Sequence, residues 1–137
     1  MMNQSNFQAA QAYRSASVAV SPLRAVIMML DGAIGFLQKS VKAAEEKQFE
    51  ESHGHMIRAT AILRGLSHNL NFDKGGAVAE RLHTTYHSLI MACLRSFGRP
   101  NAADSYRRII ESLREMRDAW ISVALQGSKP ADSNMGA

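Results

Sequence analysis

The chain has 137 residues, which suffices for one domain built around one core. Its one cysteine excludes an internal disulfide, and a formal net charge of +4, with basic and acidic residues interleaved, argues against a nucleic-acid surface. No stretch reaches the ~18 apolar residues of a membrane span, and residues 1–20 lack the apolar core of a signal peptide. We therefore expect a cytoplasmic protein without a nucleic-acid partner or a membrane span.

The chain divides into an arm, a helical domain and a tail. Residues 1–20 contain isolated apolar side chains without helical periodicity, so we expect a mobile N-terminal arm. Ser21 and Pro22 then supply an N-cap and a proline at the first helical position. Residues 126–137 are rich in Gly, Ser, Pro, Asp and Asn, which cannot bury a core and predict a disordered C-terminal tail. The folded domain is expected to span residues 21–125.

Within that domain, apolar residues recur at helical spacing in four stretches. The stretches cover residues 23–44, 49–70, 78–97 and 106–124. Polar residues, glycine or proline separate them, and none of the connections is long. Short connections between amphipathic helices fold each helix back antiparallel on the one before it. The sequence therefore predicts an all-α fold, an antiparallel up-down-up-down four-helix bundle.

The connection between the second and third helices contains two adjacent glycines, Gly75 and Gly76. Glycine adopts positive φ without the steric cost that a β-carbon brings, and the C-cap of a helix commonly needs such a residue. We therefore predict a tight glycine turn that ends the second helix, with positive φ for at least one of the two residues.

Two Glu-x-x-His pairs could suggest a di-metal carboxylate site, because this spacing places both ligands on one helix face. They are Glu50 with His53 and Glu80 with His83. In an antiparallel bundle, however, the pairs lie roughly 15 Å apart along the axis, whereas paired metals need ~3.5–4 Å. Cys93 lies on an inward stripe without an activating base. We expect no catalytic, metal or cofactor site, and a metal-binding bundle enzyme is the least favoured alternative.

Three stretches are apolar around most of the helix circumference and not along one stripe only. They are residues 23–30, 89–94 and 119–125. A bundle helix needs one apolar stripe, so the surplus side chains need cover from the arm, from a partner or from a second copy of the chain. The first and third stretches fall at the same end of an antiparallel bundle. Methionine, which the first stretch contains, suits a groove that accepts an apolar helix.

Three segments resemble, in their order and spacing, those of the FliS family of flagellar export chaperones. They are Leu30-Asp31-Gly32-Ala33-Ile34, residues 69–79 and residues 113–120. The family usually has tyrosine where this chain has Leu30. The resemblance implies a non-enzymatic four-helix bundle that binds the C-terminal segment of flagellin, prevents its premature polymerisation and assists its export. The alternative is an adaptor for another flagellar partner, such as an export-gate protein or a regulator. The sequence does not decide between a monomer and a homodimer.

Two sets of residues follow as candidates. Apolar residues expected to contact the client are Tyr13, Ile27, Met28, Leu30, Ile34, Ile90, Met91, Leu94, Trp120 and Ile121. Residues expected to be structural are Ser21, Pro22, Asp31, Gly32, Asn69, Gly75 and Gly76.

Overall fold

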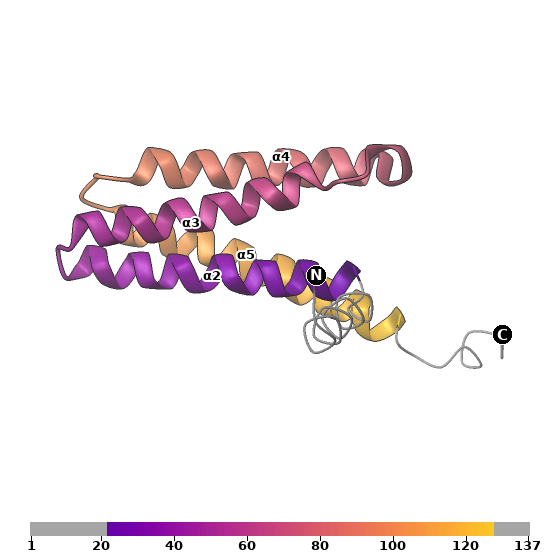
Figure 1. Ribbon diagram of the computed structural model, residues 1–137, viewed down its shortest axis with the longest axis horizontal. Coiled ribbons are helices and arrows are strands. Elements are labelled where there is room, and N and C mark those ends of the chain that lie inside the picture. The colour runs from indigo at the N-terminus through magenta and orange to yellow at the C-terminus, as the bar shows by residue number, and fades with distance from the viewer. Residues whose placement is uncertain (1–21, 128–137) are drawn as a thin grey trace, which may run out of the picture.

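The computed structural model describes residues 22–127, and this part of the chain forms four α-helices without a strand (Figure 1). The helices are α2 (Pro22–Glu45), α3 (Phe49–His68), α4 (Phe72–Ser96) and α5 (Ala102–Gly127). The predicted all-α four-helix bundle is confirmed. The predicted arm with Tyr13, the predicted N-cap Ser21 and residues 128–137 of the predicted tail lie outside the described residues.

The helices run alternately up and down, and each packs against two neighbours (Figure 1). α2 packs closely against α3 and α5. α4 also packs against α3 and α5, but less extensively. Residues 46–48 and 97–101 connect helices at one end of the bundle, which we call the loop end. The start of α2 and the end of α5 lie together at the opposite end, as the antiparallel arrangement requires.

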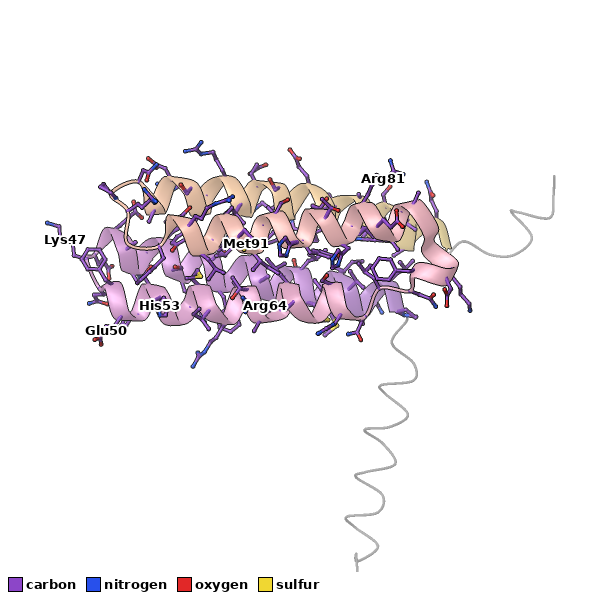
Figure 2. All side chains as sticks on the ribbon, turned by 90° about the horizontal axis from the view of Figure 1, so that it is seen from above. Lys47, Glu50, His53, Arg64, Arg81 and Met91 are labelled. Carbon is purple, nitrogen blue, oxygen red and sulfur yellow. The ribbon has the colours of Figure 1, made fainter. Side chains whose placement is uncertain are left out.

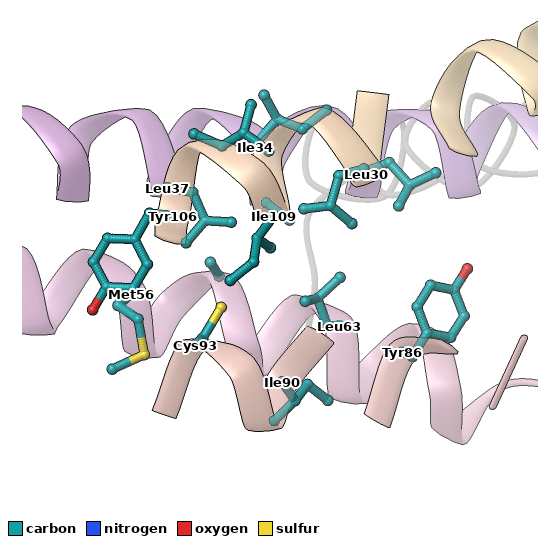
Figure 3. Close-up of a cluster of buried hydrophobic side chains, with 14 of the residues drawn as sticks. Leu30, Ile34, Leu37, Met56, Leu63, Tyr86, Ile90, Cys93, Tyr106 and Ile109 are labelled. Atoms are coloured by element: carbon teal, nitrogen blue, oxygen red, sulfur yellow. The ribbon is translucent and has the colours of Figure 1, made fainter. Parts of the chain in front are cut away.

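The core is one apolar cluster to which all four helices contribute (Figure 3). Its largest fully buried side chains are Leu30, Leu37, Met56, Leu63, Tyr86, Cys93, Tyr106 and Leu113. These residues follow the helical spacing of the sequence, so each helix turns one stripe inward. Burying a side chain of this size stabilises the fold by about 1.5–3 kcal/mol, which makes the cluster the main source of stability.

A pair of serines joins α2 and α3 inside the bundle near the loop end. The Ser40 hydroxyl donates to the carbonyl oxygen of Ser52 at 2.8 Å, and the Ser52 hydroxyl donates to the carbonyl oxygen of Ser40 at 2.9 Å. The two hydroxyl oxygens are 2.9 Å apart. Both side chains are buried, and the reciprocal bonds satisfy the polar groups that burial removes from water. The small serine side chains also suit the close approach of the two helices.

The reversal between α3 and α4 uses asparagines, and the predicted glycine turn is displaced. Asn69 is the C-cap of α3 with φ −92°, and the side-chain oxygen of Asn71 accepts from the backbone N–H of Lys74 at 3.0 Å, which caps α4. α4 therefore begins before the glycines. Gly76, with φ 51° and ψ −126°, kinks α4 after its first turn. The predicted positive φ is confirmed, but the prediction that the glycines end the second helix is wrong, because the asparagines cap both helices first.

We expect Gly76→Ala to lower the free energy of unfolding by about 1–3 kcal/mol, because its backbone occupies a region that only glycine adopts without strain. Gly54→Ala is the matched control, since Gly54 is exposed inside α3 and an added β-carbon there meets no atom within 4 Å. The control should raise stability by roughly 0.5–1 kcal/mol through helix propensity. Urea unfolding measures both. Equal changes in the two variants would contradict a special conformation at Gly76.

Candidate functional site

The start of α2 and the end of α5 lie at the same end of the bundle, and both helices carry apolar side chains there that the core leaves exposed or half-buried. Met28 is 63% exposed and Ile121 is 36% exposed, whereas Ile27 is half-buried and Trp120 is half-buried against the core. We call these four residues the α2–α5 surface. Large apolar side chains left in water in this way mark a site for a partner more often than scattered single residues do.

An ion pair ties α2 to α5 next to this surface. Arg117 Nη1 lies 3.1 Å from Asp31 Oδ1, and Arg117 also contacts Asp118. The hydrogen bond to Asp31 raises the pKa of Arg117, so the guanidinium stays charged. Because the helices are antiparallel, the residue one turn before Asp31 and the residue one turn after Arg117 lie at the same height along the bundle axis. This places Ile27 and Ile121 next to each other along the two helices.

Three of the predicted client-contact residues are not available at the surface of this structure. Leu30, Ile34 and Ile90 are all buried in the core cluster. They lie on the inward stripes of their helices, and an inward position buries an apolar side chain against neighbouring helices before any partner arrives. In this structure these three positions therefore offer a client almost no exposed apolar area. Gly32, which was predicted to be structural, faces α3, since an added β-carbon would lie 3.4 Å from Ile62 Cδ1.

Met91 and Leu94 lie on a different side of the bundle, between α3 and α4. Both are 36% exposed, and Ile57 of α3 is also exposed on this side. Figure 2 looks onto this face and labels His53 and Arg64 on α3 and Met91 on α4. We call Ile57, Met91 and Leu94 the α3–α4 surface. Sequence reasoning missed Ile57, because it follows Met56 directly and lies off the inward stripe to which Met56 belongs.

The histidines of the two Glu-x-x-His pairs have separate partners. The His53 ring lies 4.4 Å from the Phe97 ring, whereas His83 Nδ1 lies 2.8 Å from the Ser67 hydroxyl oxygen. Residues 22–127 contain no group of three His, Cys, Asp or Glu side chains placed to hold a metal ion. In the same residues, no helix combines the length and the apolar character that crossing a bilayer requires. The exposed apolar residues of the α2–α5 surface and of the α3–α4 surface support binding of apolar side chains.

Cys93 is buried, and desolvation raises the pKa of its thiol to about 12. Because the thiolate is the reactive form, we expect Cys93 to react with a disulfide reagent far more slowly in the folded protein than in concentrated urea at the same mildly alkaline pH. Absorbance of the released thiol measures both rates. Equally fast labelling in the two conditions would contradict a buried, inert thiol.

Comparison with known proteins identifies the family of this chain. Residues 4–127 match the model of the family described as flagellar protein FliS. A relative from Campylobacter jejuni subsp. jejuni serotype O:6, called flagellar secretion chaperone FliS, is 27% identical over 103 residues, which cover 75% of this chain and 80% of the relative. Because the family match spans most of the sequence, this chain belongs to the FliS family of flagellar proteins.

Proposed function

We propose that this protein is a flagellar secretion chaperone that binds the C-terminal segment of flagellin and keeps it from polymerising before export. Membership of the FliS family and the name of the Campylobacter relative support the chaperone role. The main structural support is the α2–α5 surface, where Met28 and Ile121 expose apolar area that the bundle leaves uncovered. The activity is binding in the cytoplasm, without a chemical step.

The mechanism is the burial of apolar side chains of a client helix against the bundle. A client segment that is disordered before binding loses roughly 2–5 kcal/mol on ordering. At about 25 cal/mol per Å² of apolar area, the first ~80–200 Å² buried only offset that cost. Useful affinity therefore needs more buried apolar area than this. A segment that reaches both the α2–α5 surface and the α3–α4 surface wraps around the bundle and meets this requirement.

We expect titration calorimetry to detect binding of flagellin that has its C-terminal segment and no binding of flagellin that lacks it. Affinity for the segment should change little between low and high salt, because salt screens exposed charges and leaves buried apolar area nearly unaffected. Full binding by the truncated flagellin would refute the proposed client segment. A steep loss of affinity with salt would instead indicate that charged side chains hold the client.

A further inference from the structure

A cavity of about 530 Å³ opens at the loop end of the bundle, at the opposite end from the α2–α5 surface. It lies between the α2–α3 connection and the α4–α5 connection. Phe49, Phe97, Pro100 and Ala103 give it apolar walls, and both phenylalanines are largely exposed at its edge. A volume of this size lies in the range that binding sites for small ligands and anchoring side chains occupy.

The wall of the cavity includes Tyr106, whose hydroxyl has no hydrogen-bond partner among the described residues although the side chain is buried (Figure 3). Desolvation raises the pKa of Tyr106 to about 12 and Cys93 adds to the rise, whereas the nearby Ser40 hydroxyl lowers it, although no hydrogen bond of good geometry joins the two side chains. Ser40 nevertheless directs its own hydroxyl to Ser52. Tyr106 is therefore a neutral O–H donor without an acceptor, and buried donors in native proteins usually have one.

Arginines surround the neighbouring cavity, of about 420 Å³, which shares Arg99 with the first. Its lining includes Arg95, Arg99 and Arg108 and no carboxylate. Among residues 22–127, none of the three arginines makes an ion pair. Glu45 is the carboxylate that lines the first cavity, and it pairs with Arg107, which also contacts Asp104. The acidic residues at the start of α3 line neither cavity.

We propose that these two cavities form a second binding site, which takes an acidic peptide segment of a partner protein with one bulky apolar side chain. The apolar side chain enters the cavity between Phe49 and Phe97, and a carbonyl or carboxylate oxygen accepts the hydrogen bond of Tyr106. Acidic side chains before or after it pair with Arg95, Arg99 and Arg108. The unpaired arginines and the unsatisfied hydroxyl together select acceptor oxygens, and the apolar walls select a peptide over a phosphate backbone.

The position of this site has a consequence for the chaperone cycle. Because the loop end is opposite to the α2–α5 surface, the acidic segment and a client on that surface have separate contacts. A client that stops short of the loop end leaves the bundle able to hold both at once, as an adaptor between a client and another protein. The site does not depend on the identity of the client.

The test uses the full-length protein and a fluorescein-labelled synthetic peptide, Asp-Glu-Asp-Phe-Glu-Asp, in anisotropy titrations. We expect saturable binding that Arg99→Glu weakens at least about fivefold, because it reverses a charge that both cavities share. Arg64→Glu is the matched control, since Arg64 is exposed on α3 and lines neither cavity (Figure 2). Absence of saturable binding, or equal losses in the two variants, would overturn the site.

A second variant separates the hydroxyl from the packing of the ring. Tyr106→Phe should weaken peptide binding by about fivefold, the usual effect of one lost hydrogen bond, while the melting temperature stays the same or rises. An unchanged affinity would remove Tyr106 from the site. A single-stranded DNA hexanucleotide serves as the competing probe, and tighter binding of this DNA than of the peptide would overturn the assignment to an acidic peptide.

Discussion

Ile121→Glu should lower the affinity for the C-terminal segment of flagellin at least ~tenfold, which corresponds to a loss of about 1.4 kcal/mol or more of binding free energy. A carboxylate placed in an apolar contact has to give up its hydration without gaining a partner. In the free protein Ile121 is 36% exposed, so the new charge remains hydrated and the melting temperature should hardly change. Met28→Glu, on the α2 side of the same surface, should behave in the same way. Titration calorimetry and melting curves measure the two effects.

Val123→Glu is the matched control for this experiment. Val123 is an apolar α5 residue that is 45% exposed, and it lies two positions from Ile121, about 200° around the helix. It therefore carries the same new charge on the same helix but outside the α2–α5 surface, and we expect affinity close to wild type. Similar losses for Ile121→Glu and Val123→Glu would mean that added negative charge on α5, and not this surface, weakens binding.

Leu63→Ala should lower the free energy of unfolding by about 2–5 kcal/mol, because Leu63 is 0% exposed and its removal leaves a cavity that the packed core cannot fill. A domain of this size is stable by only ~5–15 kcal/mol, so the variant is expected to unfold at a much lower urea concentration. Leu94→Ala makes the same chemical change at a position that is 36% exposed, and it should cost less than about 1 kcal/mol.

Urea unfolding followed by circular dichroism at helical wavelengths measures both leucine variants. Equal losses of stability would show that Leu63 and Leu94 are packed alike, which is incompatible with the arrangement of α3 and α4 described above. The comparison also tests whether the α3–α4 surface is free to receive a client, because a leucine already buried by the bundle has little area left to offer.

Helical periodicity predicted the four helices and most of the core, because a bundle buries one stripe per helix and the stripe is visible in the sequence. Leu37, Leu63 and Leu113 are buried as their spacing indicates. Periodicity is least informative where a helix is apolar all round. In the stretch around Ile90 and Met91, neighbours on the helix differ by ~100°, and only the position of the other helices decides that Ile90 is buried and Met91 is exposed.

Features that depend on contacts between distant parts of the chain could not be predicted. Phe97 is the last residue of the third apolar stretch in the sequence, yet it is 40% exposed and touches His53 of α3, because α4 ends there. Nothing local reveals that contact. The helix boundary after Asn71 was missed for a different reason: asparagine suits turns and helix caps alike, and the adjacent glycines gave the stronger local signal.

The paired serines of α2 and α3 determine more than local hydrogen bonding. Two apolar stripes attract each other at many alignments, and sliding α3 along α2 by one helical turn, about 5.4 Å, would still bury leucines against leucines. This shift would also break the hydrogen bonds between Ser40 and Ser52 and leave both hydroxyls unsatisfied in an apolar interior. Each unsatisfied group would lower the stability of the fold by roughly 1–3 kcal/mol. The serine pair thus selects one register out of several, and it fixes the level at which the ends of the helices, with the surfaces they form, face the solvent.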